Sequence, residues 1–392
     1  MSYLKTYQEE IESCIGCGLC GVSCPTFGVR GFDSNTPRGR MVIARALLEG
    51  RLELTDAVVE RILNCCDCGY CAVRCSPDII EAIRAVKAEI AARGKMPMPG
   101  MRVAEYVAKN HNLSSRPHEE RFAWLPEELR SPRRADVLFY VGCGGSYSVP
   151  GECRATVKIM DKAGVKWTTL GEDEWCCGYI LYELGAPDKV QEAAQHNVSA
   201  LNHAVESLGV RKVVFQCAAC LHFFRTYPQR FGLTIDPSLE MLHVTEFFNE
   251  LIEEGKIRFK EWNGTCVYHD NCVLGRREGI YEAPRENLRA IPQSRLVEME
   301  HNRYFSRCCS GMPRFYGAHS SYGLEPDAQS ARYRELANAL TEKRIKEAEE
   351  SGADVLVTAC TGCQRTLGLM AQKNHAKVKV RMLSEVLADL LV

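Results

Sequence analysis

The sequence has no excess of charge of either sign, with 49 lysine and arginine residues against 50 aspartate and glutamate residues. This balance argues against a binder of nucleic acid or anionic membranes, because either would need a basic patch. No run approaches the roughly 18 apolar residues of a membrane-spanning helix, and the first ten residues lack the apolar core of a secretion signal. We therefore expect a cytoplasmic protein with no direct membrane insertion.

The sequence also has no Gly-x-x-x-x-Gly-Lys-Ser/Thr run for binding phosphates. We therefore expect no nucleotide or flavin site in this chain. What the chain has in abundance is cysteine, with 21 residues among 392. Secreted disulfide scaffolds are shorter and denser in cysteine, above about 8%, and have an even count. In a reducing compartment so many thiols indicate bound metal.

Eighteen of the cysteines fall into four groups. The first group is Cys14, Cys17, Cys20 and Cys24, followed by Pro25, which is the bacterial [4Fe–4S] ferredoxin spacing. The second group repeats this spacing with Cys65, Cys68, Cys71 and Cys75. Zinc is the competing interpretation, but zinc sites use separated pairs of cysteines rather than such dense runs.

Two runs of this type predict two cubane clusters with exchanged fourth ligands. We assign one cubane to Cys14, Cys17, Cys20 and Cys75, and the other to Cys65, Cys68, Cys71 and Cys24. Cys66 is out of register with this spacing, and we expect it to be a surface bystander.

The third and fourth groups share a different order: one cysteine, a Cys-Cys pair, then Cys-x-x-Cys. The third group is Cys143, Cys176, Cys177, Cys217 and Cys220, and the fourth is Cys272, Cys308, Cys309, Cys360 and Cys363. Five thiolates from one domain are too many for a tetrahedral zinc or a cubane. An ordinary cubane or a structural zinc that uses four of the five stays open as an alternative for each set.

The secondary-structure pattern changes along the chain. Residues 1–94 are predicted to be mostly helical, with apolar residues at helical spacing over 40–48 and a capping pair, Asp78 and Glu81, that opens a second helix. Residues 101–135 are expected to form a connector with one or two helices, largely a solvated linker.

Beyond the connector, short apolar runs lead directly into cysteines, with helical segments between them. These runs lie at 136–141, 213–216, 265–268 and 354–358. Strands that alternate with helices predict an α/β unit with a parallel sheet. Since the cysteines repeat their order, we expect residues 136–262 and 263–392 to be two copies of one such unit.

The first two cysteine groups carry a family resemblance. The stretch Thr36-Pro-Arg-Gly-Arg-Met, then residues 46–52, then the second cysteine run, resembles the α-helical ferredoxin domain of heterodisulfide-reductase-type proteins. Similar domains occur in the iron–sulfur subunits of glycolate and lactate oxidases and of succinate dehydrogenases.

The later groups resemble the CCG domain of the same family. Cys176-Cys177-Gly178 fits the domain's name, whereas the second copy has Ser310 inserted before its glycine. The run from Tyr268 to Arg276 resembles the family's His-Asp-Pro-Cys-x-Leu-Gly-Arg motif, with Asn271 in place of proline. The layout is similar to that of the D-type subunits of heterodisulfide reductases and of related subunits in dissimilatory sulfite-reductase membrane complexes and class II benzoyl-CoA reductase complexes.

The resemblance implies an α + α/β fold: an α-helical ferredoxin domain (1–100), a connector (101–135) and two CCG domains (136–262 and 263–392) with short parallel sheets. It implies that each five-cysteine set binds a noncubane [4Fe–4S] cluster. Glycines around these sets, such as Gly142, Gly178 and Gly311, would let backbone N–H groups approach sulfur, or would merely form turns.

The resemblance further implies a subunit of a multisubunit iron–sulfur oxidoreductase. Its cubanes would pass electrons between a flavoprotein partner and the CCG clusters, with disulfide or thiol chemistry at the second cluster, on Cys308 and Cys309. Two alternatives stay open. One is an electron-transfer bridge with no substrate of its own, as in a class II benzoyl-CoA reductase complex, and the other is the iron–sulfur subunit of a 2-hydroxyacid oxidase feeding quinone.

A few other residues are candidates for roles in this chemistry. His269 could protonate a departing thiolate, or could be a structural partner of Asp270. Arginines 276, 277 and 314 could bind an anionic substrate group, but a surface role is the simpler expectation. His222 and His243 are expected to be core or surface residues.

Overall fold

Short helices build the N-terminal part of the computed structural model, which describes residues 3–75, 78–318 and 323–392. Side-chain caps fix three of the helix starts: Thr36 accepts from the N–H of Gly39, Thr55 from Val58, and Asp78 from Glu81. The helices are α1 (Tyr3–Thr6), α2 (Gln8–Glu12), α3 (Phe27–Arg30), α4 (Pro37–Leu48), α5 (Asp56–Leu63) and α6 (Ile79–Ala92).

A four-stranded parallel sheet with the order β2-β1-β3-β4 follows. Its strands are β1 (Val137–Tyr140), β2 (Trp167–Thr168), β3 (Lys212–Phe215) and β4 (Glu240–His243). Its helices are α8 (Gly142–Tyr147), α9 (Pro150–Lys162), α10 (Tyr179–Glu183), α11 (Val190–His203), α12 (Ala218–Thr226) and α13 (Val244–Glu253), and α11 runs into the π-helical turn η8 (Ala204–Leu208).

The second sheet repeats this topology with the order β6-β5-β7-β8. Its strands are β5 (Thr265–Tyr268), β6 (Arg295–Val297), β7 (Val355–Thr358) and β8 (Lys379–Met382). Its helical elements are the π-helical turn η10 (Val273–Arg277), α14 (Ala283–Arg289), α15 (Gly311–Tyr316), α16 (Ser330–Glu350), α17 (Thr361–Lys373) and α18 (Leu383–Leu390). The predicted α + α/β fold is confirmed.

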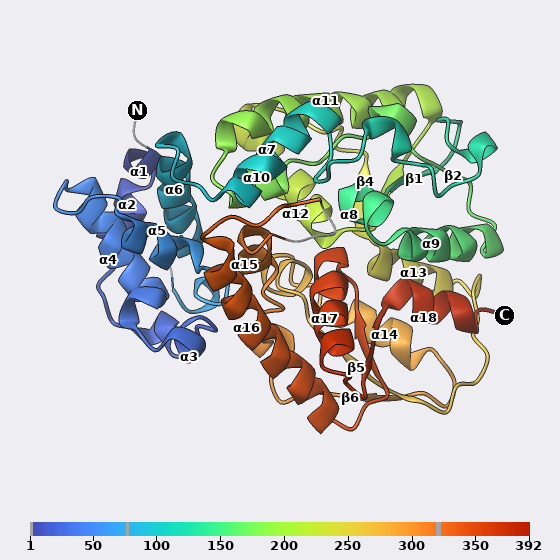
Figure 1. Cartoon of the computed structure of the whole chain (residues 1–392). Helices are drawn as coiled ribbons and strands as arrows, with labels where there is room; N and C mark the ends of the chain where they lie inside the picture. The colour runs from blue at the N-terminus through green and yellow to red at the C-terminus, as the bar shows by residue number, and fades with distance from the viewer. Residues whose placement is uncertain (1–2, 76–77, 319–322) are drawn as a thin grey trace.

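The three parts pack closely together (Figure 1). The blue N-terminal helices lie to one side, and the green and orange α/β units are stacked beside them. Helix α6 contacts α10 of the first unit, α3 contacts α16 of the second, and the C-terminal α18 packs on α9 of the first unit. In the part of the chain that the structure describes, no helix is both long and apolar enough to cross a membrane.

The expectation of a solvated linker over residues 101–135 is wrong. Helix α7 (Met98–Asn110) begins this region, and Arg121, Phe122 and Leu125 are all buried. The Arg121 guanidinium donates to Glu174 at 2.9 Å, in the loop after β2, so this segment is part of the first α/β unit's packing. Composition was misleading here because a charged residue can be buried when it is paired.

Candidate metal centres

The first predicted cubane site is assembled as the sequence suggests. Cys14, Cys17, Cys20 and Cys75 line one pocket of about 290 Å³, together with Arg38 and Arg74. Cys17 is exposed, so this site lies at the molecular surface. The structure therefore brings together cysteines separated by 55 residues or more, although ligation of a cluster by them stays a prediction.

The second predicted cubane site is buried deeper. Cys24 lies with Cys65, Cys68 and Cys71 around one pocket, again with the fourth cysteine exchanged between the two runs. The Arg40 guanidinium is also buried here and donates to the Thr26 hydroxyl at 3.1 Å. Burial raises the pKa of the Cys65 thiol, and the charge of Arg40 opposes this effect and so favours the thiolate form, which is the form that binds iron. The sequence pattern does not indicate that Arg40 is buried, because an arginine on an amphipathic helix is ordinarily exposed.

Exchange of the fourth ligand leads to a testable result. In Cys75→Ala the pocket at the surface is incomplete, and in Cys24→Ala the buried pocket is incomplete. We expect each variant to lose iron from one cubane only, up to about four irons per chain, with a different electron paramagnetic resonance signal lost in each. Loss of the same signal in both variants would contradict the exchanged assignment.

The ten cysteines of the two later sets line a single cavity of about 160 Å³. They come from both α/β units: Cys143, Cys176, Cys177, Cys217 and Cys220 from the first, and Cys272, Cys308, Cys309, Cys360 and Cys363 from the second. The remaining lining is largely apolar, with Leu113, Ile180, Val273, Met312 and Phe315. The two sets thus share one space, which no sequence pattern indicates.

Sheet topology explains how the sulfurs meet. Cys143 and Cys217 follow β1 and β3, and Cys272 and Cys360 follow β5 and β7, so all lie beyond the carboxyl ends of central strands. Gly142 is required for the close approach, because its φ is +74° and a Cβ there would lie 3.1 Å from the Cys220 Sγ. At this position the glycine is more than a turn former.

Hydrogen bonds between the thiols shift their acidities. Those from Cys176 and Cys220 lower the pKa of Cys177 to about 6. In the second set, Cys308 and Cys363 lower the pKa of Cys309 well below its ordinary value, and the Cys363 and Cys309 sulfurs are 3.2 Å apart. Backbone N–H groups also reach sulfur, as Ser310 does to Cys308 at 3.2 Å. Such donors stabilise thiolates and tune clusters bound by them.

Cys66 is not a surface bystander, contrary to expectation. It is only 5% exposed and lines both the second cubane pocket and the shared cavity. Both Cys66 and Cys68 hydrogen-bond with Cys308, which together with burial raises their pKa values well above the ordinary value. The second cubane site is therefore in direct contact with the second five-cysteine set.

His269 lies beside the second set, but its partner is Arg344 rather than Asp270. The Arg344 Nε donates to His269 Nδ1 at 3.0 Å, and a ring nitrogen lies within 4.8 Å of the Cys309 and Cys363 sulfurs. Burial and the nearby guanidinium hold the His269 pKa well below its ordinary value. Asp270 instead forms a bidentate pair with Arg285 at 2.6 and 2.8 Å.

Arg276 and Arg277 are not surface residues. Arg276 Nε donates to the Cys68 carbonyl at 2.7 Å, and Arg277 donates to Asp67 at 2.9 Å. Both therefore connect the second α/β unit to the loop of the second cubane site. Arg314 donates to Asn338 at 2.9 Å and is only partly exposed. His222 and His243 are buried, so of the two expected positions, core or surface, they occupy the core.

Comparison with known proteins agrees with this arrangement. Residues 10–79 match the 4Fe-4S dicluster domain, and residues 137–225 and 266–368 match the cysteine-rich CCG domain. The fold and these domains define an iron–sulfur oxidoreductase of the CCG class.

Within that class, the chain belongs to the family of the heterodisulfide reductase D subunits. It is 32% identical over 97% of its length to the D subunit of the dihydromethanophenazine:CoB–CoM heterodisulfide reductase of Methanosarcina barkeri, covering 94% of that protein. It is also 27% identical to an EtfAB:quinone oxidoreductase of Syntrophomonas wolfei, over 96% of this chain and 58% of that protein.

A solved structure shares the fold. The crystal structure of a hypothetical protein from Helicobacter pylori superposes with a TM-score of 0.52 at 10% identity, covering 80% of this chain and 58% of that one.

The dicluster match implies two [4Fe–4S] clusters, and the CCG domains bind iron–sulfur clusters.

Proposed function

We propose that this protein interconverts a disulfide and two thiols in the cavity shared by its CCG domains. Electrons would be exchanged with a flavoprotein partner through the two cubanes. The single observation that carries this proposal is the cavity itself, which both five-cysteine sets line, one from each α/β unit. A disulfide held there would present one sulfur to each set.

The residues present fit iron–sulfur clusters by the chemistry of their donors. Each site offers soft sulfur ligands, which select iron–sulfur clusters over hard cations. The lowered pKa values of Cys177 and Cys309 favour thiolates in each CCG set. We propose noncubane [4Fe–4S] clusters on the two five-cysteine sets, and cubanes on Cys14, Cys17, Cys20, Cys75 and on Cys65, Cys68, Cys71, Cys24. When bound, these groups supply electrons one at a time.

The positions of the sites support an order of electron transfer through the molecule. The surface cubane site is the one with an exposed cysteine, so a partner can approach it. The buried cubane site contacts the second CCG set through Cys66, Cys68 and Cys308. We propose that electrons reach the second set first and that Cys308 and Cys309 hold its reactive centre.

His269 lies beside this centre as a neutral imidazole. Because Arg344 donates to Nδ1, the single ring proton of the neutral imidazole is on Nε2. Such a ring can donate a hydrogen bond to a nearby sulfur and stabilise its negative charge. We therefore propose that His269 positions and polarises the second set, and that the proton of the reaction comes from another group.

One relative favours a second candidate function. The similarity to an EtfAB:quinone oxidoreductase suggests a chain that only carries electrons toward quinone. In that case the CCG centres would carry electrons, and no disulfide would react in the cavity.

Anaerobic purification and analysis test the proposal. With four-iron clusters at all four sites we expect roughly sixteen irons per chain, and about eight would leave only the ferredoxin half. A reduced viologen dye should then drive reduction of small disulfides, measured as free thiol formed. Full iron content with no thiol from any disulfide tested would favour the electron-carrying alternative.

A further inference from the structure

One carboxyl group reaches the edge of the shared cavity. Glu183 ends α10, which begins two residues after Cys177, and Glu183 lines the cavity together with Cys66 and Met312. Its side chain is 12% exposed, so it can also exchange protons with solvent. A group that reaches both solvent and a largely apolar cavity can carry protons between them.

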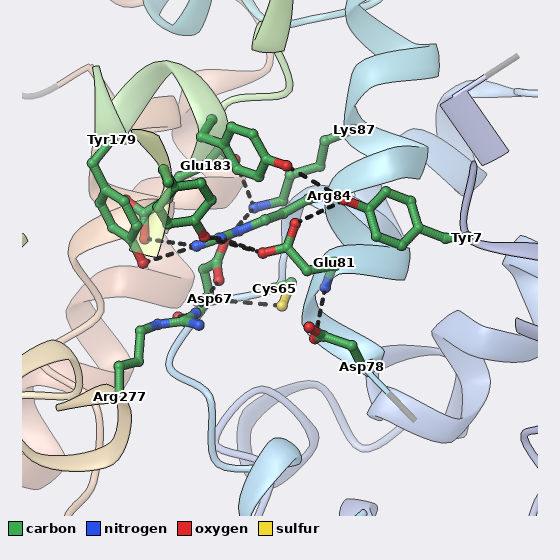
Figure 2. A network of polar contacts seen from close by, with 12 residues as sticks. Tyr7, Cys65, Asp67, Asp78, Glu81, Arg84, Lys87, Tyr179, Glu183 and Arg277 are labelled. Atoms are coloured by element: carbon green, nitrogen blue, oxygen red, sulfur yellow. Dashed lines mark hydrogen bonds and ion pairs between the residues drawn. The ribbon is translucent and has the colours of Figure 1, made fainter. Parts of the chain in front are cut away.

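Glu183 belongs to a buried network centred on Arg84 (Figure 2). The guanidinium donates to Asp67 at 3.0 Å and to Glu81 at 2.8 Å, and it also donates to Tyr179 and Tyr227. Glu183 lies farther away, with its Oε1 3.6 Å from the Arg84 Nη2. Its closer link is through its backbone carbonyl, which accepts from Lys87 at 3.0 Å.

Of the three carboxylates around Arg84, Glu183 is the least stabilised as an anion. Asp67 is also paired with Lys87 and Arg277, and Glu81 is also paired with Arg230 at 3.2 Å. In the part of the chain that the structure describes, the Glu183 carboxylate forms its ion pair with Arg84, at the longer distance of 3.6 Å. Burial, and then the negative charge of Asp67, raise the pKa of Glu183 to about 7.

The deprotonated form is tolerated as well. Four cations, Arg84, Lys87, Arg230 and Arg277, surround the two carboxylates Asp67 and Glu81, so the network has an excess of positive charge that a third negative charge reduces. The titratable and charged groups that face Glu183 from the packed elements are Asp67, Arg84, Lys87, Tyr179, Arg277 and Tyr316. None of these six is a predicted cluster ligand.

We propose that Glu183 is the acid that protonates a sulfur released in the shared cavity, and that Arg84 positions its carboxyl group. This inference rests on the proposed disulfide chemistry. Two electrons from an external reduced donor, delivered through the chain's iron–sulfur centres, break the S–S bond of R–S–S–R′. The Glu183 carboxyl gives its proton to one sulfur, so that R–SH, R′–S⁻ and the Glu183 carboxylate result. Solvent then returns the proton to Glu183, and the reverse sequence applies to thiol oxidation.

The test compares Glu183→Gln with Glu192→Gln, an exposed glutamate on the neighbouring α11. Each substitution keeps the size and shape of the side chain and removes one titratable carboxyl group. We expect Glu183→Gln to lower dye-driven disulfide turnover by roughly 10²-fold, the lower range for general acid catalysis, with KM and iron content unchanged. We expect Glu192→Gln to match the parent protein.

The pH profile separates an acid from a structural residue. In the parent protein kcat should fall as pH rises through the pKa of Glu183, about 7, because the protonated carboxyl is the active form. That limb should be absent in Glu183→Gln. Infrared difference spectra without any disulfide should show a protonated carboxyl that titrates in this range in the parent protein only.

Three outcomes would overturn the inference. Equal turnover and equal pH profiles in parent and Glu183→Gln would show that another group donates the proton. Loss of iron or a raised KM in Glu183→Gln would show a structural role. A parent protein that reduces no disulfide but shows the infrared titration would refute the proposed function, and with it the catalytic step, while retaining the titrating carboxyl.

Discussion

Replacing Cys309 with alanine is expected to abolish disulfide reduction while leaving both cubanes in place. Cys309 lies at the centre of the second set, 3.2 Å from Cys363 and in hydrogen-bonding contact with Cys308. Changes to groups that merely support metal ligands cost 10- to 100-fold in activity, so we expect a loss of more than about 100-fold here. Free thiol formed from a disulfide with a reduced dye measures the effect, and iron should fall by about four per chain.

Two matched variants accompany this substitution. Cys177 is the equivalent residue of the first set and lines the same cavity. If a disulfide is held between the sets, Cys177→Ala should lose turnover as well. Cys266→Ala removes an equally buried thiol in β5 that lies outside both sets and should keep turnover and iron. Full turnover in Cys309→Ala, or in Cys177→Ala, would mean that the corresponding set does not hold the substrate.

The central strands were predictable because each is a short, largely apolar run. The strands β1 and β7 are buried along their whole length, and they coincide closely with the runs at 136–141 and 354–358. The outer strands β4 and β8 were not recognised, because they begin with exposed polar residues and only their last residue is buried. An edge strand can be recognised only through the strand with which it pairs, and that pairing is set by the tertiary structure.

The ligand sets were predictable from spacing, but their mutual arrangement was not. Spacing alone suggested that Cys75 and Cys24 exchange between the two runs, and the structure brings each into the expected pocket. No local pattern could indicate that the two CCG sets line one cavity, or that Cys66 lies between a cubane site and Cys308. These facts depend on how three units pack, which the periodicity of any one unit does not encode.

The buried cations were missed for a related reason. Arg40, Arg84, Arg121 and Arg285 are all buried, although a charged residue is ordinarily exposed. Their burial is tolerated because each finds partners from distant segments, such as Glu174 for Arg121. Charge patterning within a single helix cannot reveal such partners.

Removing the buried Arg84 guanidinium is expected to destabilise the whole protein. Arg84→Met keeps much of the side-chain volume in α6 but removes the group that Asp67, Glu81, Tyr179 and Tyr227 share. Removing one partner from a buried ion pair costs about 3–5 kcal/mol. We expect a loss of this size in the free energy of unfolding, measured by anaerobic urea titration followed by circular dichroism.

The same substitution should also disturb the second cubane site. Asp67 lies between Cys66 and Cys68 with a φ of +53°, a left-handed conformation that is uncommon for residues other than glycine. Burial raises the Asp67 pKa, but Arg84, Lys87 and Arg277 outweigh it and hold the pKa below its ordinary value. Because the folded-state pKa is depressed, this carboxylate stabilises the fold above its unfolded pKa, and the contribution is lost as pH falls. Arg84→Met should weaken that acid dependence and release iron from the second cubane first.

Arg93→Met, at the C-terminal end of the same helix, is the control. Arg93 is largely exposed and lies 3.6 Å from Glu89, so its removal should cost less than about 1 kcal/mol. If Arg84→Met and Arg93→Met unfold at the same urea concentration, the network does not stabilise the fold. If Arg84→Met is destabilised but keeps all its iron up to unfolding, Arg84 acts on the domain packing and not on the loop that carries Cys65 and Cys68.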